Sequence, residues 1–288
     1  MKKPDLSIII VNYDTKALLK QCLESVLSIK YQVLSIEIII VDNNSTDGSV
    51  EYLLGSGFQV TGISKSKTRN QKPETRNLIL IRNDRNLGFA AANNQGIKIA
   101  RGECILLLNS DTIVRKGALE KLVAFAQRTP DAGVVVARLL NPDGAIQPSC
   151  YHSPSISGAM KEFWLGEKGA FSKYAPRGKK PVAVDAAVGA AFLISKKTIE
   201  KIGFLDERYF MYFEDLDYCR RAWWAGLKVY YLPEAEIIHS HGASGKKLDQ
   251  QPNKWLIQSS KIYYGILKHY LINLIIWSGQ KWQKVRKN

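Results

Sequence analysis

The chain has 288 residues, of which 45% are hydrophobic and 23% are charged, a balance that is ordinary for a soluble globular protein able to bury a hydrophobic core. The formal net charge of +15 favours an anionic partner such as a nucleotide diphosphate, a nucleic acid or an acidic membrane surface, although solubility alone would also explain it. No stretch offers about 18 uninterrupted apolar residues, so a membrane-spanning helix is not expected.

The cysteines and the N-terminal segment favour a cytoplasmic protein. No two cysteines lie at the spacing of a zinc knuckle or a redox motif; the four are Cys22, Cys104, Cys150 and Cys219. A reduced compartment is therefore expected, with Cys22 and Cys104 as core thiols. The first apolar run, residues 6–11, is too short for the core of a signal peptide, and a polar loop follows it.

The first half of the chain alternates predicted strands with predicted helices. Short apolar runs predict buried strands at 6–11, 37–41, 78–81 and 104–108. Helical spacing of apolar residues predicts helices within 15–28, 88–100 and 116–128. This order predicts an α/β fold with a mostly parallel sheet and helices on both faces. The polar, basic insertion at 55–77 has little pattern and is expected to be a surface loop.

Three of the predicted strands end in polar residues. These ends are Asn12-Tyr13-Asp14, Asp42-Asn43-Asn44 and Asn109-Ser110-Asp111. One polar strand end indicates only a turn, but in an open parallel sheet the ligand site lies beyond the carboxyl ends of the strands. Three such ends at one edge therefore predict a single cleft, in which carboxylates face a sugar, a base or a metal.

The second half contains one well-marked helix and one poorly patterned segment. The helix, 213–226, carries three acids in its first turn, where the helix dipole favours them, and capping alone would explain all three. Further along this helix, two side chains of the set Arg220, Arg221, Trp223 and Trp224 are expected to face the cleft. Upstream, 188–207 predicts a strand, a helix and a turn, and 150–181 is expected to be an irregular loop over the active site.

Four blocks of the sequence resemble, in order, the inverting GT-A glycosyltransferases of family 2. They are SIIIVNYDTKALLKQCLESV, IIIVDNNSTDGSVEYL, NLGFAAANNQGIKIARGECILLLNSDT and FMYFEDLDYCRRAWWAGLKVYYLPEAEIIHSHGAS. Within that family, the rhamnosyltransferase-like enzymes of bacterial cell-surface polysaccharide synthesis are the most similar branch. The resemblance implies a Rossmann-like GT-A domain at 1–245, with a nucleotide-sugar-binding half at 1–115 and an acceptor half at 116–245. A basic, amphipathic helical tail would follow at 246–288.

The same resemblance implies which residues bind the donor nucleotide. Asp42 resembles the carboxylate that accepts a hydrogen bond from the imide N–H of a pyrimidine. The other positions implied to bind the nucleotide are Val11, Tyr13, Asp14, Asn86, Gly88, Asn94, Asn109 and Ser110. Asn93 departs from the family pattern, because many relatives carry an arginine there, so a contact that neutralises phosphate must come from elsewhere.

A divalent cation, Mg²⁺ or Mn²⁺, is implied by a triplet that resembles the DxD motif. Its first acid is replaced by Asn109, so Asp111 would be the metal-binding member, and an amide at Asn109 suits a ribose or sugar hydroxyl. A second ligand would come from His239 or His241, and the His-x-x-Gly spacing of the family favours His239. The cation would neutralise the departing diphosphate.

The general base implied by the resemblance is Asp215, with Glu214 orienting the acceptor or the helix. A carboxylate held beside other carboxylates has its charged form disfavoured, which raises its pKa towards a value useful for proton transfer.

The tail combines apolar and aromatic residues with basic ones. Residues 255–277 are interrupted by Lys261, Lys268 and His269, and a basic end follows. This pattern is typical of a helix at a membrane interface. Packing on the catalytic domain, or on a second subunit in a homodimer, would also explain it.

The expected function is metal-dependent, inverting transfer of a sugar from a UDP- or dTDP-sugar, dTDP-rhamnose among them. The acceptor would be a glycan or a polyprenyl-diphosphate-linked sugar at the inner face of the cell membrane. A nucleotidyltransferase acting on sugar phosphates would show a glycine-rich loop, which residues 11–20 lack. A nucleic-acid-binding protein would show basic-aromatic strands or a recognition helix, so no nucleic-acid partner is expected.

Overall fold

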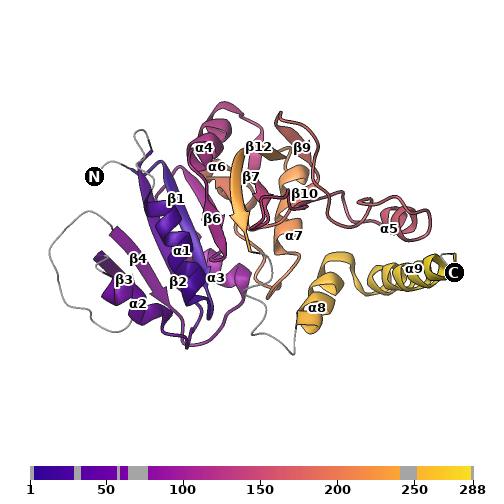
Figure 1. The fold of residues 1–288 in the computed structure, drawn as a ribbon, viewed down its shortest axis with the longest axis horizontal. Coiled ribbons are helices and arrows are strands. Elements are labelled where there is room, and N and C mark those ends of the chain that lie inside the picture. The colour runs from indigo at the N-terminus through magenta and orange to yellow at the C-terminus, as the bar shows by residue number, and fades with distance from the viewer. Residues whose placement is uncertain (1–2, 29–33, 57–58, 64–76, 241–251, 287–288) are drawn as a thin grey trace.

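The computed structural model describes residues 3–28, 34–56, 59–63, 77–240 and 252–286. Residues 57–58 and 64–76 of the predicted basic insertion, the alternative ligand His241 and the predicted boundary at 245/246 all lie outside the described residues. Figure 1 shows a central sheet with helices on its two faces and, at one end, a helical tail.

The first half of the sheet is parallel, as predicted. Its strands lie in the spatial order β3-β4-β2-β1-β5. Their bounds are Leu6–Asn12 for β1, Ile36–Asp42 for β2, Gln59–Ile63 for β3, Asn77–Arg82 for β4 and Cys104–Leu108 for β5. The four predicted strands are confirmed. Strand β3 corrects the prediction of an unstructured insertion, because β4 offers it a free parallel edge.

The second half continues the same sheet with mixed directions, in the order β5-β11-β7-β12-β6. These strands are β6 (Thr112–Val114), β7 (Ala132–Leu140), β11 (Ala191–Ser195) and β12 (Lys228–His239), with β9 (Val182–Val184) beside β12. Strand β11 runs antiparallel to both β5 and β7, and β12 runs parallel to β7. A small second sheet pairs β8 (Cys150–Tyr151) with β10 (Ala186–Ala187).

Helices cover both faces of the sheet. Alternate residues of β1, Leu6, Ile8 and Ile10, pack into a core with α1 (Lys16–Leu27), α2 (Ser49–Gly55) and α4 (Ala118–Arg128). Ile9 faces the opposite core, which includes α3 (Phe89–Ile99), α6 (Lys196–Ile202) and α7 (Glu214–Trp224). All four cysteines are buried free thiols, and burial raises the pKa of Cys22 to about 12. The two layers therefore hold the carboxyl ends of β1, β2 and β5 rigidly at one edge.

Helix α5 (Ile156–Phe163) corrects the prediction that 150–181 is irregular. The hydroxyl oxygen of Ser155 caps the helix by accepting a hydrogen bond from the Gly158 amide at 3.0 Å. A Cβ at position 158 would lie 2.6 Å from the carbonyl oxygen of Ala170, so the packing requires glycine there. Glycine weakens the local helix signal, and tertiary packing compensates for it.

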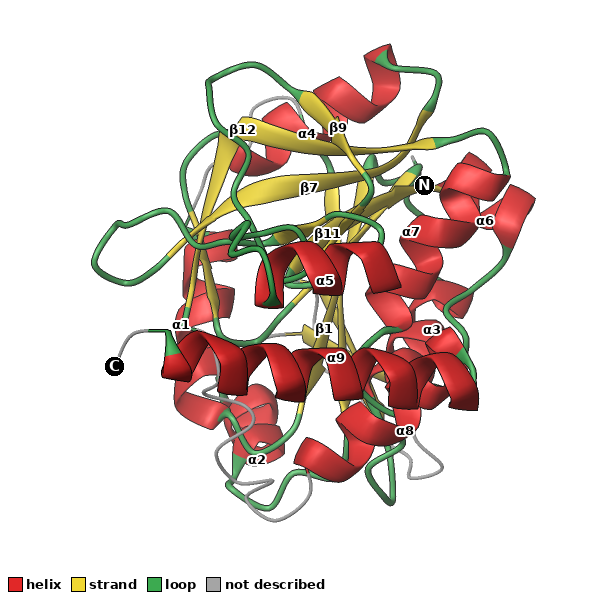
Figure 2. Ribbon diagram, turned by 90° about the vertical axis from the view of Figure 1, so that its right-hand side faces the viewer, coloured by secondary structure: helices red, strands yellow, loops and turns green. Residues whose placement is uncertain are grey.

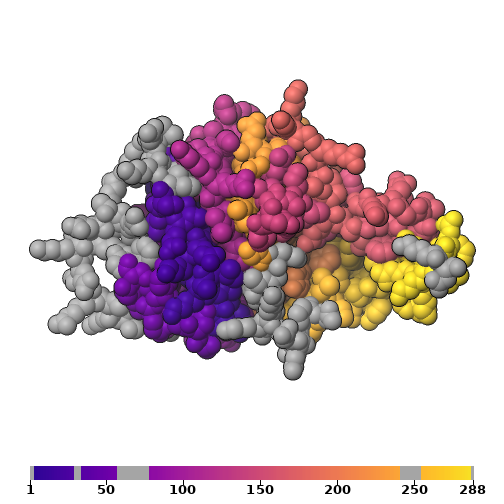
Figure 3. Space-filling model, viewed as in Figure 1, coloured from indigo at the N-terminus to yellow at the C-terminus, as the bar shows by residue number. Residues whose placement is uncertain are grey.

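The tail consists of α8 (Pro252–Tyr264) and α9 (Ile266–Val285), and α9 packs on α5. Helices α9 and α5 lie side by side in Figure 2. The Gln283 amide of α9 donates a hydrogen bond of 2.8 Å to the carbonyl oxygen of Phe163 at the end of α5. The indole N–H of Trp164 donates to the carbonyl oxygen of Ile275 at 3.3 Å. In the space-filling view, the tail (yellow) lies against the segment that carries α5 (Figure 3). Among the described helices, none is both long and apolar enough to cross a membrane.

Candidate active site

A cavity of about 630 Å³ lies at the carboxyl edge of the sheet and extends to the tail. This volume is in the range of small-molecule sites. Predicted site residues line it together: Val11, Tyr13, Asn86, Gly88, Asn109, Ser110, Asp111, Glu214, Asp215 and His239. The tail supplies a largely apolar wall, with Leu256, Ile257, Tyr264, Ile272 and Ile276.

Asp14, Asp42 and Asn94, all predicted to bind the nucleotide, are not among the residues that line this cavity. The buried carboxylate of Asp42 accepts hydrogen bonds from the Asn12 amide at 2.9 Å and from the Ser45 backbone N–H at 3.0 Å. Asp14 accepts a hydrogen bond from the backbone N–H of Thr46 at 2.6 Å. These two carboxylates therefore order the loops after β1 and β2, which flank the cavity.

Asn94 has a structural environment. Its amide donates to the carbonyl oxygen of Leu205 at 2.8 Å and to Glu207 at 2.9 Å, and its oxygen accepts from the Leu205 N–H at 3.0 Å. Both donors and the acceptor are engaged inside the protein, so we leave Asn94 out of the proposed site.

Gly88 lies at the cavity, where the loop before α3 contacts the loop before α7. Its φ of +85° lies in a region that L residues rarely adopt, and a Cβ there would lie 2.4 Å from the carbonyl oxygen of Phe210. The next residue, Phe89, donates its backbone N–H to that same oxygen at 2.7 Å. Glycine is therefore required because the loop before α3 docks directly on the loop before α7.

Asp111 and His239 meet because β6 pairs with β12. The register places His239 opposite Thr112, and Nε2 of His239 lies 3.4 Å from Oδ1 of Asp111. The Nδ1 atom of the same ring lies 2.7 Å from Oε1 of Gln147. The amide nitrogen of Gln147 donates to Asn141 and to a backbone carbonyl, which assigns Oε1 as an acceptor and Nδ1 as the protonated nitrogen.

This arrangement fits a divalent cation. Imidazole ligands in proteins bind metal through one nitrogen while the other donates to an oxygen, as Nδ1 does here towards Gln147. Within the described ranges, no group of three or more histidine, cysteine or acidic side chains is placed to hold a metal. Asp111 and His239 would supply two ligands to such a cation, and water and phosphate oxygens would have to supply the others.

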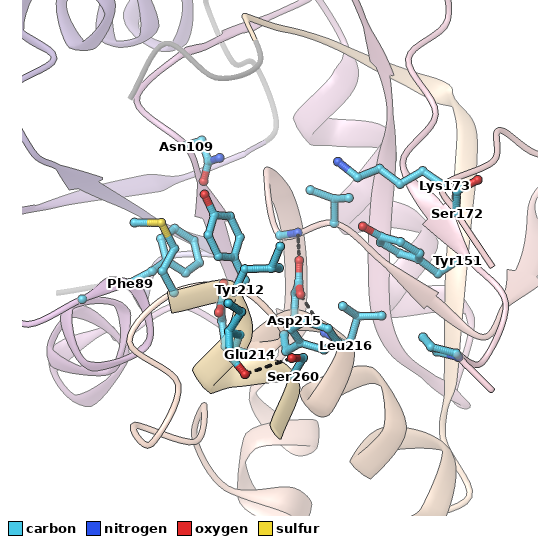
Figure 4. A pocket seen from close by; sticks show the side chains of 18 of the residues that line it. Phe89, Asn109, Tyr151, Ser172, Lys173, Tyr212, Glu214, Asp215, Leu216 and Ser260 are labelled. Carbon is cyan, nitrogen blue, oxygen red and sulfur yellow. Dashed lines mark hydrogen bonds between the residues drawn. The ribbon is translucent and has the colours of Figure 1, made fainter. Parts of the chain in front are cut away.

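The backbone before α7 directs two adjacent carboxylates into the cavity (Figure 4). Tyr212 and Phe213 have φ of 70° and 69°, a conformation that costs about 1–3 kcal/mol for each such residue. This strain turns the chain sharply at the first residue of α7. Glu214 and Asp215 consequently face the interior of the cavity from the start of the helix.

Asp215 is held in one orientation by backbone donors. Its Oδ2 accepts from the Gly189 N–H at 2.9 Å, and its Oδ1 accepts from the Leu216 N–H at 2.8 Å. Burial raises the pKa of Asp215, while these hydrogen bonds and the charge of Lys173 act against the rise. A Cβ on Gly189 would make ordinary contact with Asp215, so the backbone N–H of Gly189 matters more than its small size.

Glu214 is more completely buried than Asp215. Burial and, next, the neighbouring charge of Asp215 raise the pKa of Glu214 well above its ordinary value. Its Oε2 atom is buried and has no hydrogen-bond partner among the described residues. One negative charge shared between two adjacent carboxyl groups is therefore favoured over two.

The basic and aromatic residues later in α7 do not line the cavity, which corrects the prediction that two of them face it. Asp217 is buried and pairs with Arg220 at 2.7 Å and Arg221 at 2.8 Å, so it holds the helix surface together. None of Arg220, Arg221, Trp223 and Trp224 lines the cavity, and Trp224 is 76% exposed. Sequence periodicity could not distinguish the cavity-facing side of α7 from its outer side, because both sides carry polar residues.

Several residues that line the cavity were not predicted from the sequence, among them Tyr151, Lys173 and Tyr212. Tyr212 stands two residues before Glu214 in an aromatic run, and this position was a usable signal. Tyr151 and Lys173 lie in the poorly patterned segment 150–181, where no local signal exists. The tail residues Ser260 and His269, whose Oγ and Nδ1 lie 2.7 Å apart, reach the cavity only through tertiary packing.

Comparison with known proteins assigns the chain to a family. Residues 7–203 match the sequence profile described as "Glycosyl transferase family 2", which is more than half of the chain. The chain belongs to glycosyl transferase family 2. Membership of this family favours a sugar transferase over the nucleotidyltransferase and nucleic-acid-binding alternatives. The pair Glu214–Asp215 and the tail lie beyond the matched residues.

Relatives of known name include rhamnosyltransferases. The chain is 28% identical over 224 residues to an N-acetylglucosaminyl-diphospho-decaprenol L-rhamnosyltransferase of Mycobacterium tuberculosis, covering 71% of this chain and 66% of the relative. It is 24% identical over 167 residues to the dTDP-rhamnosyl transferase RfbF of Shigella flexneri, covering 57% of this chain and 52% of the relative. The chain is also 29% identical to the protein y4gI of Sinorhizobium fredii, but it spans only 25% of the length of that relative.

Solved structures show the same fold at low identity. GalNAc-T7, in a complex with UDP, GalNAc and Mn²⁺, is similar with a TM-score of 0.60 and 16% identity, over 83% of this chain and 44% of that one. The mannosyltransferase PcManGT of Pyrobaculum calidifontis, with GDP-Man and Mn²⁺, has a TM-score of 0.57 and 15% identity, over 95% of this chain and 65% of that one. The predicted GT-A fold is thereby confirmed.

The raised pKa of Glu214 predicts a pH-dependent stability cost. Because the folded protein binds this proton more tightly than the unfolded chain, stability falls as pH rises from the ordinary value of 4.5 towards the raised pKa. Glu214→Gln is therefore expected to raise the melting temperature at neutral pH, with the gain vanishing below about pH 4. Calorimetry over this pH range measures it.

The matched control for this stability measurement is Glu200→Gln, which changes an exposed carboxylate on α6. Its effect should stay within about 0.5 kcal/mol at every pH. Equal melting temperatures of wild type and Glu214→Gln across the range would mean that Glu214 imposes no folding cost.

Proposed function

We propose that this family 2 glycosyltransferase catalyses metal-dependent, inverting transfer of a sugar from a UDP- or dTDP-sugar to a lipid-linked glycan acceptor. One observation carries the proposal. The pair Asp111–His239 and the pair Glu214–Asp215 face a single cavity, one wall of which is the apolar inner side of the tail.

The donor nucleotide would occupy the end of the cavity at the sheet edge. Val11, Tyr13, Asn86, Gly88, Asn109 and Ser110 line this end. The Oδ1 atom of Asn109 is buried without a hydrogen-bond partner in the described part of the chain, which suits an acceptor for a ribose or sugar hydroxyl. The name of the Shigella flexneri relative supports dTDP-rhamnose as the first donor to test.

Asp111 and His239 would hold Mg²⁺ or Mn²⁺ against the donor diphosphate. A bound cation of this kind neutralises the charge that develops on the departing diphosphate. The carboxylate oxygen and imidazole nitrogen offered here suit Mn²⁺ well, and the oxygen also suits Mg²⁺. Phosphate oxygens and water would complete the shell, so the metal and the nucleotide are expected to bind together.

Asp215 would act as the general base in one displacement at the anomeric carbon. Its carboxylate takes the proton of the acceptor hydroxyl while the hydroxyl oxygen bonds to the anomeric carbon and the bond to the diphosphate breaks. The backbone N–H groups of Gly189 and Leu216 fix the carboxylate for this step. Burial raises the pKa of Asp215, which makes its carboxylate a stronger base.

A lipid-linked acceptor is supported by the composition of the cavity wall. Side chains of α8 and α9 give that wall an apolar character, which suits the hydrocarbon chain of a lipid. The Mycobacterium tuberculosis relative is named for a diphospho-decaprenol-linked acceptor. An acceptor of this class would place its sugar near Asp215 and its apolar chain along the tail.

The outer side of the tail would lie on an anionic membrane surface. Large apolar residues of α9 are exposed at helical spacing, 44–87% for each: Leu267, Tyr270, Leu271, Leu274 and Trp277. Residues 252–286 contain no Asp or Glu, whereas Lys254, Lys261, Lys268, Lys281, Lys284 and Arg286 are all basic. This stripe beside positive charge matches an interfacial helix. A second copy of the tail would instead bring like charges together.

The base assignment predicts the behaviour of Asp215→Asn. This variant should fold and bind nucleotide normally, yet transfer sugar at least about 10²-fold more slowly, because only the proton acceptor is lost. The wild-type rate should fall as pH drops through the raised pKa of Asp215, since the base must be deprotonated. Turnover with dTDP-rhamnose and other dTDP- or UDP-sugars, on a polyprenyl-diphosphate-linked N-acetylglucosamine, measures both. Near-normal turnover would transfer the role to Glu214, tested by Glu214→Gln.

The metal assignment predicts nucleotide-linked Mn²⁺ binding. Titration by electron paramagnetic resonance should show weak binding without UDP or dTDP and marked binding with one of them. Asp111→Ala should abolish the linked binding, and His239→Ala should weaken it. The control Asp84→Ala, an exposed carboxylate, should leave it intact. Linked binding that survives Asp111→Ala unchanged would reject the metal site.

The membrane assignment predicts sedimentation of the protein with vesicles that contain phosphatidylglycerol, and little with neutral vesicles. Changing Leu267, Leu271 and Leu274 together to Ser should lower the partition coefficient at least about ten-fold, because each buried leucine contributes roughly 1.5–3 kcal/mol. The control Leu54→Ser, on α2 at the far end of the molecule, should have no effect. Concentration-dependent dimerisation lost in the triple variant, without vesicle binding, would assign this surface to a second copy.

A further inference from the structure

Lys173 is the only Lys or Arg among the described residues that line the cavity, although the chain contains 41 such residues. Three carboxylates, those of Asp111, Glu214 and Asp215, line the same cavity. In Figure 4 the side chain of Lys173 extends from the wall that also carries Tyr151, with its amino group directed into the interior.

The backbone on both sides of Lys173 is anchored. On one side, Glu162 of α5 accepts hydrogen bonds from the backbone N–H groups of Phe171 at 2.7 Å and Ser172 at 2.9 Å. On the other side, Tyr174 exchanges backbone hydrogen bonds with Cys150, of 2.8 Å and 3.0 Å. Lys173 therefore projects from a fixed position, although its segment has no regular secondary structure.

The tail reinforces this position. Glu162 and Phe163 end α5, and the Gln283 amide of α9 donates to the carbonyl oxygens of both, at 3.2 Å and 2.8 Å. A Cβ on Gly279 would lie 2.6 Å from the carbonyl oxygen of Phe163, so the two helices are in backbone contact there. The helix that carries the anchor of Lys173 is thus clamped between the domain and the tail.

The amino group of Lys173 has no ion-pair partner among the residues that the structure describes. Among the described residues, no carboxylate oxygen lies within 4 Å of it. Burial lowers the pKa of Lys173, and the more distant charge of Asp215 acts in the opposite direction. A half-buried cation without a pair is unfavourable in the free protein and becomes favourable when an anion enters the cavity.

We propose that Lys173 binds a phosphate group of a bound substrate, and this proposal rests on the proposed glycosyltransferase function. The phosphate belongs either to the donor nucleotide or to a polyprenyl-diphosphate-linked acceptor. In both cases the ammonium group makes a charge-assisted hydrogen bond to a phosphate oxygen in a cavity whose other charged side chains are acids.

The test compares wild type with Lys173→Met, which keeps the length of the side chain and removes its charge, and with Lys173→Arg, which keeps the charge. Lys179→Met, an exposed lysine of the same segment, is the matched control. Calorimetry in the presence of Mn²⁺ measures the Kd of UDP and dTDP for the donor, and of farnesyl diphosphate against uncharged farnesol for the acceptor. Thermal melting verifies that every variant is folded.

Lys173→Met is expected to raise the Kd of at least one phosphate-bearing probe roughly ten-fold or more, because it removes a hydrogen bond to a charged group. The Kd of farnesol should not change. Lys173→Arg should retain most of the affinity, and Lys179→Met all of it. A loss confined to UDP and dTDP assigns the donor phosphate, and a loss confined to farnesyl diphosphate assigns the acceptor phosphate.

Unchanged affinity of Lys173→Met for all three phosphate probes would overturn the proposal. If the pH dependence of turnover shifted at the same time, Lys173 would act only on the charge of Asp215. If wild type bound none of the probes, the proposed function would fail, and the assignment of Lys173 with it. These two failures are distinguishable because the first leaves wild-type binding intact.

Discussion

The short antiparallel pairing of β6 with β12 is the constraint on which the candidate site depends. It carries the chain from the end of β5 across the sheet, so that Thr112 stands opposite His239 and Asp111 comes within 3.4 Å of that ring. Main-chain hydrogen bonds fix this geometry and do not depend on a bound ion. A cation could therefore be bound by groups that are already in place, which reduces the conformational entropy lost on binding.

Several features around the cavity are unfavourable for folding, and the layered core compensates for them. Glu214 is buried next to Asp215, Tyr212 and Phe213 adopt left-handed backbone conformations, and Lys173 has no ion pair among the described residues. Each is stable only because buried strands and helices hold the surrounding backbone. Strain and mismatched charge concentrated at one cavity are typical of sites shaped for a ligand or a reaction.

The tail has an inner side that faces the cavity and an outer side that is exposed. The inner side of α8 and α9 closes the cavity and clamps α5, whereas the outer side of α9 exposes an apolar stripe beside basic residues. If that outer side lies on a membrane, the same helices would set the distance between the lipid surface and Asp215. A lipid-linked acceptor would then reach the site without leaving the membrane.

The sequence by itself determined the elements whose signal is local. Apolar runs marked β1, β2, β4 and β5, the polar triplet after β5 marked Asp111, and the acids at the start of α7 marked Glu214 and Asp215. Only the tertiary structure decided which side chains share a cavity, because that depends on contacts between distant segments. Asp42 and Asn94 carry suitable groups, yet internal partners engage them. Lys173 carries no motif, and it reaches the cavity because Glu162, Cys150 and the tail hold its unpatterned segment in place.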